Sequence, residues 1–155
     1  MRSAVVVYDS WYGCTRAVAE EIARGLSADG KVATVVAHIK DTTPEQVRDH
    51  DVIVIGSPNH FGAPTPRARA LVQRLRGFDL RGKRIAFFDT CFARDRGKAL
   101  ASLEAQLRER NPMVTPPYLG LSVVVEGTRG PIVAGEMSHA GELGSSIRSS
   151  LALTV

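Results

Sequence analysis

Short apolar runs alternate with amphipathic segments along this chain, and this alternation limits the possible folds more than any other feature. The apolar runs lie at residues 4–8, 31–39, 51–57, 84–88 and 119–125. Each has the length of a buried strand, and the segments that follow have the apolar spacing of helices. The pattern predicts an α/β fold of three layers, in which helices cover both faces of a doubly wound, five-stranded parallel sheet.

The segments between the apolar runs have the start and stop signals of helices. Residues 16–26 carry an apolar stripe, and Asp29-Gly30 is expected to end that helix. A short helix is expected at Thr43-Pro44, because proline suits the first helical position. Further helices are expected after Pro66, over residues 97–110 with a stop at Asn111-Pro112, and around Leu143, Ile147 and Leu151, with a start weakened by Gly141 and Gly144.

Length and composition indicate one domain over residues 1–155. The chain has 155 residues, and 44% of them are hydrophobic, which is enough for one continuous core. Its apolar runs have the length of strands and are too short to span a membrane. Met1-Arg2-Ser3 leads directly into the first strand, which leaves no room for a signal peptide. We therefore expect a cytoplasmic protein with no membrane partner.

Charge and cysteine content exclude several other functions. The formal net charge is +4, but the basic residues are dispersed among Glu and Asp. Because no nucleic-acid motif accompanies them, a solvated basic face is favoured and no nucleic-acid partner is expected. Cys14 and Cys91 lie far apart and have no metal-ligand spacing, so we expect two free thiols and no metal site.

The stretch Ser10-Trp11-Tyr12-Gly13-Cys14-Thr15 connects the first strand to the first helix. Backbone N–H groups converge in such a turn beside the positive end of the helix dipole, which favours an anion such as phosphate. Ser10 and Thr15 add hydroxyl donors, and Gly13 allows close approach of the backbone. A plain helix start with Ser10 or Thr15 as the N-cap explains the same residues. Neither the nucleoside triphosphate nor the dinucleotide glycine fingerprint follows this strand.

Three loops of the predicted sheet meet at the edge where ligands bind in folds of this kind. The first, third and fourth strands lead into residues 10–15, 57–65 and 89–97. In open parallel sheets, ligands bind at the carboxyl ends of the strands. Phe61 and Phe92 in the second and third loops could cover a flat ring. Together with the phosphate turn, they favour a ligand that has both a ring and a phosphate.

These residues resemble the flavodoxin superfamily. Ser10-x-Tyr12-Gly13-x-Thr15 is similar to the signature that holds the phosphate of FMN in flavodoxins. The run from Tyr8 to Arg16, taken with Val54-Ile55-Gly56-Ser57-Pro58, is most similar to the flavodoxin domains of flavodiiron proteins. The resemblance covers nearly the whole chain in the order of its elements. It implies a flavodoxin-like sheet with strand order 2-1-3-4-5, and FMN as the cofactor.

The resemblance also implies which residues hold the FMN. The phosphate is expected to bind Ser10, Trp11, Tyr12, Gly13, Cys14 and Thr15, and Arg16 either helps from the rim or lies on the surface. One face of the isoalloxazine falls to Pro58, Asn59, His60, Phe61 and Gly62, and the other to Thr90, Cys91 and Phe92. Gly62 is the expected source of a peptide that hydrogen-bonds flavin N5, because a glycine peptide can flip at low cost.

The expected function is electron transfer by bound FMN, with a redox partner protein and with the chain a monomer or homodimer. A small FMN-dependent NAD(P)H:quinone or flavin oxidoreductase is the alternative, in which His60 or Asp89 assists proton transfer. A flavin-free binding module of the same fold is a third possibility. A receiver domain is disfavoured, because Ser57 stands where a phosphorylated aspartate is required.

Overall fold

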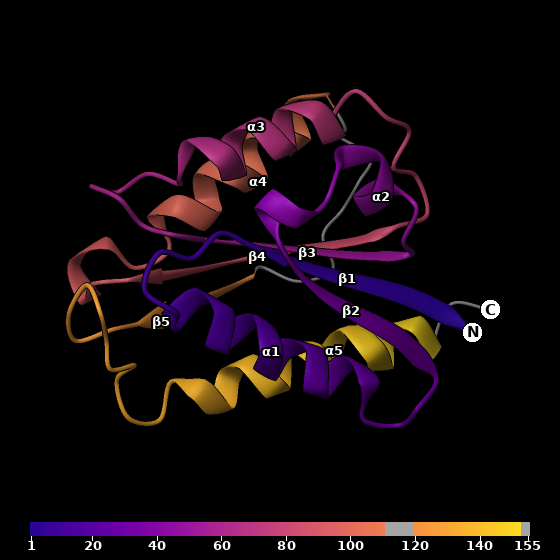
Figure 1. The fold of residues 1–155 in the computed structure, drawn as a ribbon. Coiled ribbons are helices and arrows are strands. Elements are labelled where there is room, and N and C mark those ends of the chain that lie inside the picture. Colours follow the sequence, from indigo (N-terminus) through magenta and orange to yellow (C-terminus); the bar gives the residue numbers. More distant parts are fainter. Residues whose placement is uncertain (111–119, 153–155) are drawn as a thin grey trace.

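The computed structural model describes residues 1–110 and 120–152 and contains a five-stranded parallel sheet with order β2-β1-β3-β4-β5 (Figure 1). The strands are β1 Arg2–Tyr8, β2 Val32–His38, β3 Val52–Pro58, β4 Arg84–Cys91 and β5 Leu121–Val124. Every adjacent pair in this sheet is parallel. The predicted α/β class, the five parallel strands and their order are therefore confirmed.

Helices cover both faces of the sheet, as predicted. They are α1 Cys14–Ser27, α2 Pro44–Arg48, α3 Pro66–Leu75, α4 Lys98–Arg110 and α5 Met137–Ala152, with the short 3-10 turns η1 Ile39–Asp41 and η2 Ala93–Asp95. In Figure 1, α1 and α5 lie on one side of the sheet, and α2, α3 and α4 lie on the other. No helix in the described ranges is long and apolar enough to cross a bilayer.

The central strands are buried on both faces, so their sequences are almost continuously apolar. Val6 and Val54 point into the core beneath α1 and α5, whereas Val5 and Ile53 point into the core beneath α3 and α4. Edge strand β2 is less covered, and Val35 is half exposed. Alternate residues of one strand thus serve two separate cores, as the side-chain period of a strand requires.

Two helices begin earlier than the sequence pattern predicts. Helix α1 starts at Cys14, two residues before the expected start, and α5 starts at Met137 and runs through Gly141 and Gly144. A Cβ atom on Gly144 would lie 2.1 Å from the carbonyl oxygen of Ile22 in α1. Close packing against α1 therefore explains a glycine inside α5. The expected stop at Asn111-Pro112 lies outside the described residues, as does the beginning of the expected strand at 119–125.

Candidate functional site

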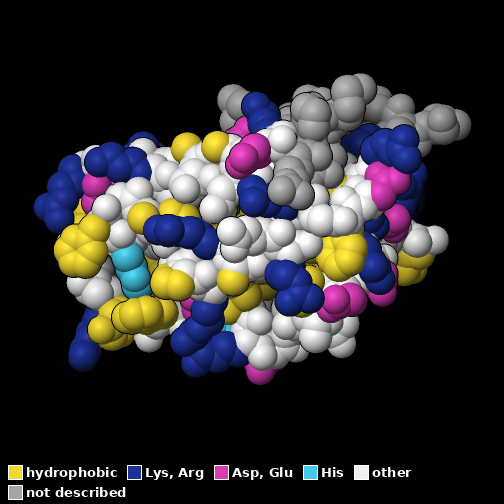
Figure 2. All heavy atoms as spheres, turned by 90° about the horizontal axis from the view of Figure 1, so that it is seen from above, with side chains coloured by type: hydrophobic (Ala, Val, Ile, Leu, Met, Phe, Trp, Pro, Cys, Tyr) yellow, Lys and Arg dark blue, Asp and Glu magenta, His cyan; other side chains and the backbone are white. Residues whose placement is uncertain are grey.

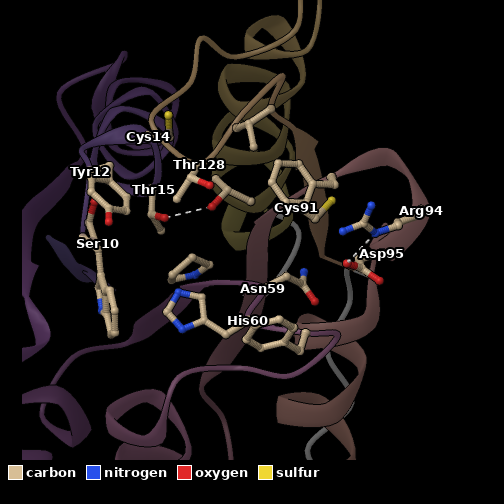
Figure 3. Close-up of a pocket in the computed structure, with 16 residues that line it drawn as sticks. Ser10, Tyr12, Cys14, Thr15, Asn59, His60, Cys91, Arg94, Asp95 and Thr128 are labelled. Atoms are coloured by element: carbon tan, nitrogen blue, oxygen red, sulfur yellow. Dashed lines mark hydrogen bonds and ion pairs between the residues drawn. The ribbon is translucent and has the colours of Figure 1, made fainter.

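A cavity of about 400 Å³ opens at the carboxyl edge of the sheet, where three predicted site loops meet (Figure 3). Its lining consists of Ser10, Trp11, Tyr12, Cys14, Thr15, Pro58, Asn59, His60, Phe61, Thr90, Cys91, Phe92, Arg94, Asp95, Val125 and Thr128. All the predicted site residues except Gly13, Gly62 and the rim residue Arg16 are in this set; Arg16 is exposed and pairs with Glu20. The parallel strands bring segments as far apart in the sequence as Ser10 and Thr128 to one edge, as expected for the ligand side of such a sheet.

The start of α1 lies at one end of this cavity and has no side-chain cap. Gly13 is the N-cap residue and adopts φ 97°, in the left-handed region. The Ser10 hydroxyl oxygen accepts a hydrogen bond from the Gly13 amide at 3.0 Å and therefore orders the turn just ahead of the helix. Neither Ser10 nor Thr15 caps α1, so the plain-cap interpretation of this stretch is wrong.

Other helices of the same chain do have side-chain caps. The Thr43 hydroxyl accepts from the Gln46 amide at the start of α2, and the Thr65 hydroxyl accepts from the Ala68 amide at the start of α3. The first amides of any α-helix lack an intrahelical acceptor. At α1 these amides stay open beside a cavity, where the helix dipole also favours negative charge.

Thr15 joins this turn to strand β4. Its hydroxyl lies 2.9 Å from the hydroxyl of Thr90, and both residues are buried (Figure 3). One hydroxyl of such a pair donates to the other, so the second keeps a proton for a further acceptor. The contact fixes the distance between the first and third loops.

Aromatic side chains surround the mouth of the cavity. Trp11 is 58% exposed, Tyr12 is 49% exposed and Phe61 is fully exposed. The Trp11 ring meets the ring of His60 edge to face, with 4.5 Å between the ring centres. On the third loop, Phe92 lines the cavity and the Arg94 guanidinium lies 5.3 Å from its ring centre. Flat apolar surfaces therefore face the cavity from the first, second and third loops.

The second loop is a tight turn with an unusual backbone. The amide of His60 donates to the Ala63 carbonyl at 2.8 Å, and the amide of Ala63 donates back at 3.1 Å. The two residues between them have positive φ, 54° at Phe61 and 81° at Gly62. A bulky residue seldom adopts this conformation, because its Cβ is crowded. Gly62 does not line the cavity, whereas Phe61 does.

Asp89 holds the second and third loops together from behind the cavity wall. Its carboxylate is fully buried and accepts hydrogen bonds from the side-chain amide of Asn59 at 2.9 Å, from the Leu100 backbone amide at 3.1 Å and from the Ser122 hydroxyl. Burial raises the pKa of Asp89 above its ordinary value, although these hydrogen bonds oppose the shift. Asp89 does not line the cavity, so its contacts support a positioning role.

Asn59 leaves one buried polar atom unused. Its Nδ2 donates to Asp89, whereas its Oδ1 is buried and accepts no hydrogen bond from the described residues. Buried polar atoms normally have a partner, so an unpaired one at a cavity wall indicates a place for a ligand donor. The backbone amide of Asn59 donates to the Thr90 carbonyl at 2.8 Å, which anchors the residue.

Both cysteines line the cavity as free thiols, as predicted. Burial raises the pKa of the Cys14 thiol and of the Cys91 thiol. The Cys91 sulfur also lies 3.1 Å from the Ser122 hydroxyl. A raised pKa keeps a thiol protonated and weakly nucleophilic at neutral pH. The two thiols therefore contribute apolar surface to the wall of the cavity. The described residues contain no cluster suited to a metal ion.

Sequence reasoning missed four lining residues and a second hollow. Arg94 and Asp95 belong to η2, and Val125 and Thr128 follow β5. The fifth strand ends at the same sheet edge, which was the available signal for the last two. The second hollow, of about 420 Å³, shares part of the first loop and adds two basic side chains. Its lining consists of Ser10, Trp11, Tyr12, Lys40 and Arg67.

Fold and cavity define a doubly wound α/β protein with an uncapped helix start and an aromatic-lined cavity at the carboxyl edge of its sheet. Residues 5–115 match the family model described as flavodoxin domain. The match covers more than half of the chain, and the chain belongs to this family. The predicted resemblance to the flavodoxin superfamily is confirmed, and domains of this family bind a flavin, usually FMN.

Solved structures share the fold at low identity. Flavodoxin 1 from Bacillus cereus is 20% identical with a TM-score of 0.79, and the likeness covers 99% of each chain. The rubredoxin oxygen:oxidoreductase from Desulfovibrio gigas is 18% identical with a TM-score of 0.83 and covers 100% of this chain and 38% of that one. The flavodiiron protein from Giardia intestinalis is 20% identical with a TM-score of 0.80, over 99% of this chain and 37% of its own.

A curated relative is similar to this chain in part of its sequence. The protein named NAD(P)H dehydrogenase (quinone) from Cupriavidus metallidurans is 30% identical over 53% of this chain and 51% of its own length. The chain therefore spans about half the length of the curated relative it matches. The family and this relative support a flavodoxin-type flavin redox role.

Proposed function

We propose that this chain binds FMN in the cavity at the carboxyl edge and acts in electron transfer. Bound FMN supplies one-electron or two-electron transfer, and the protein sets its potentials through its surroundings. The residues proposed to hold it are those predicted from the sequence, namely Ser10 to Thr15, Pro58 to Gly62 and Thr90 to Phe92, together with Arg94, Asp95, Val125 and Thr128.

The uncapped start of α1 at one end of an apolar cavity carries this proposal. Gly13 in the left-handed region leaves the first amides of the helix without a side-chain acceptor. Neutral N–H donors can hold a phosphate dianion where water is excluded and where the helix dipole adds to them. The Ser10 hydroxyl, which orders the turn, keeps these donors in place.

The rest of the cavity suits a flat ring that carries polar edges. Phe92 and the Trp11–His60 pair offer ring surfaces, and the unpaired Oδ1 of Asn59 offers an acceptor to a ligand N–H or O–H group. The two hydrogen bonds of the turn use the amides of His60 and Ala63 and leave those of Phe61 and Gly62 for a ligand. We propose that the Phe61–Gly62 peptide forms a hydrogen bond with flavin N5.

Comparison of FMN with riboflavin tests the phosphate site directly. The purified chain should take up FMN with a shifted visible spectrum and quenched flavin fluorescence. It should bind riboflavin, which lacks the phosphate, at least about a hundredfold more weakly, as expected from several charge-assisted hydrogen bonds. A colourless chain that takes up neither compound would favour the flavin-free binding module instead.

A second candidate is an FMN-dependent NAD(P)H:quinone or flavin oxidoreductase. The curated relative favours it, and so does the second hollow, where Lys40 and Arg67 could receive the phosphate of a nicotinamide cofactor. His60 lines the flavin cavity and could exchange a proton there. Rapid bleaching of the FMN-loaded chain by NAD(P)H, with no partner reductase present, would support the enzyme. Slow bleaching would favour the carrier.

A further inference from the structure

We propose that the mouth of the cavity is a positively charged docking face for an acidic electron-transfer protein. The face comprises the exposed rings Trp11, Tyr12 and Phe61 and the cations Lys40, Arg67, Arg94 and Arg129. In Figure 2, Lys and Arg side chains surround exposed hydrophobic side chains and a histidine at one end of the molecule. This inference rests on the proposed electron-transfer function and names the charge of the partner.

The positive groups of this face are exposed, whereas their carboxylate partners are buried, as for Asp9, or mostly covered, as for Asp95. The Arg67 side chain is 45% exposed and reaches Asp9, which is 1% exposed. The Arg94 side chain is 78% exposed, and that of its neighbour Asp95 is 14% exposed. A protein that approaches this face therefore meets guanidinium groups first, and the carboxylates only orient them.

Two further cations have no ion-pair partner within the described part of the chain. Lys40 is exposed beside the second hollow, and the guanidinium of Arg129 lies 5.2 Å from the ring centre of Tyr12. Asp41 and Glu126 are the exposed carboxylates nearest to them in sequence, and neither lines a hollow. The field at the face is positive, and its range is about 10 Å at 0.1 M salt.

The centre of the face is apolar, and one of its rings is held there by a strained backbone. Phe61 is fully exposed and has φ 54°, a conformation that is strained in a bulky residue. Neither feature adds to the stability of the isolated chain. Both are explained if the ring packs against another surface.

The composition of the face favours a protein partner over a nucleic acid. Protein interfaces have an apolar, aromatic centre with arginine and a polar rim, and this face has that arrangement. Its cations encircle a cavity mouth and do not form the continuous basic stripe typical of nucleic-acid sites. The acidic partner would thereby be guided to the open edge of the flavin cavity, where electron transfer is shortest.

The single tryptophan of the chain allows the local field to be measured without flavin. Trp11 lies in the face, next to the hollow lined by Lys40 and Arg67. In the flavin-free protein at pH 8, where histidine is neutral, anionic iodide should quench its fluorescence about three times more strongly than cationic caesium. The excess should vanish as added sodium chloride screens the field.

A charge-matched pair of variants separates the face from the net charge. Lys40→Glu/Arg129→Glu should reverse the preference for iodide over caesium. Arg2→Glu/Lys31→Glu makes the same change in net charge at the opposite, amino end of the sheet, where both residues are exposed, and it should leave the preference unchanged. Unfolding midpoints report whether each variant is folded. Equal quenching by both ions, or equal effects of both variants, overturns the proposal.

Electron transfer between proteins tests the docking itself. Reduced plant-type ferredoxin, which is acidic, should pass one electron to the FMN-loaded chain fastest at low ionic strength. The dithionite-reduced chain should pass one electron to oxidised cytochrome c, which is basic, with the opposite salt dependence. Lys40→Glu/Arg129→Glu should slow the ferredoxin reaction about tenfold at low salt, and Arg2→Glu/Lys31→Glu should not.

The outcomes distinguish this inference from the proposed function. If the chain binds no FMN, the proposed function fails, while the quenching measurement still decides whether the face is positive. If FMN binds but cytochrome c shows the salt dependence expected for ferredoxin, the docking face is wrong and the flavin site stands. Tight binding of a DNA oligonucleotide with no effect of salt on the ferredoxin rate also overturns the proposal, in favour of a nucleic-acid partner.

Discussion

The two ends of α1 are built in opposite ways. At its first turn, Gly13 leaves the helix uncapped beside a cavity. At its last turn, Gly25 packs so closely on α5 that a Cβ atom would lie 2.3 Å from the Gly141 carbonyl oxygen, and the Arg148 guanidinium donates to the Gly25 carbonyl at 2.8 Å. One end has unused N–H donors, whereas at the other end a backbone carbonyl accepts a hydrogen bond from a side chain and the backbone is closely packed. Stability and ligand binding are therefore assigned to different ends of one helix.

The largest expected effect on stability comes from a substitution at the packed end of α1. Gly144→Ala places a methyl group against the backbone of α1 and should lower the free energy of unfolding by about 3 kcal/mol, because α1 and α5 must separate. Urea denaturation measures it. Gly141→Ala is the matched control in the same helix, since its Cβ would have no neighbour nearer than 3.7 Å, and it should raise stability by up to about 1 kcal/mol. Equal effects would refute close packing.

A substitution of Asp89 tests whether contacts at the cavity also stabilise the fold. Asp89→Ala leaves the buried donors of Asn59, Leu100 and Ser122 without their acceptor and should lower stability by roughly 2 kcal/mol. FMN affinity should fall as well, because the side chain of Asn59 loses the acceptor that orients it. A variant with unchanged stability and affinity would show that the carboxylate holds nothing in place.

The raised pKa of Asp89 also predicts the direction in which stability changes with pH. Because burial raises its pKa in the folded state, the unfolded chain releases this proton first, above about pH 4. The folded state then binds more protons, so stability falls as pH rises from about 4 to the folded-state pKa. Asp89→Asn removes the titration. The unfolding free energy of the native chain minus that of Asp89→Asn should therefore decrease over this range, and a flat or rising difference would contradict the raised pKa.

Substitutions of two glycines, one before and one after α1 in the sequence, test the open end of this helix. Gly13 and Gly30 both have positive φ, and a Cβ atom on either would meet nothing within 4 Å. Alanine should therefore cost about 1 kcal/mol of stability at each position through backbone strain alone. Only Gly13→Ala should weaken the binding of FMN, by about tenfold, and it should leave the binding of riboflavin unaffected. If Gly30→Ala weakens FMN equally, the effect is global and the phosphate site is misplaced.

The smallest expected effect is a gain at the cavity mouth. Phe61→Asn places a residue that tolerates positive φ at the turn and removes an exposed ring, so stability should rise by about 0.5–1 kcal/mol. Thermal unfolding measures this. Phe61→Leu is the control, because it is also poorly suited to positive φ and should not stabilise. A loss of stability in Phe61→Asn would mean that the ring already packs within the isolated chain.

The sequence determined the sheet because the information is local. Continuous apolar runs such as Val52 to Ile55 indicate strands buried on both faces, and the helical segments between them require parallel crossovers. The motif around Gly13 indicated the first loop for the same reason. The hydroxyl and glycine pattern lies within six consecutive residues.

Tertiary structure decided the features that depend on distant residues. No local pattern distinguishes Gly144, where a Cβ atom would collide with the backbone of α1, from Gly141, where it would not, and the sequence treated both as helix-weakening. Asp89 resembled a loop carboxylate with a proton-transfer role until the structure showed it buried behind Asn59. The exposed cations of the cavity mouth come from four segments of the chain, so their common field exists only after folding. Short-range pattern fixes which elements form, whereas burial, close packing and charge depend on which elements meet.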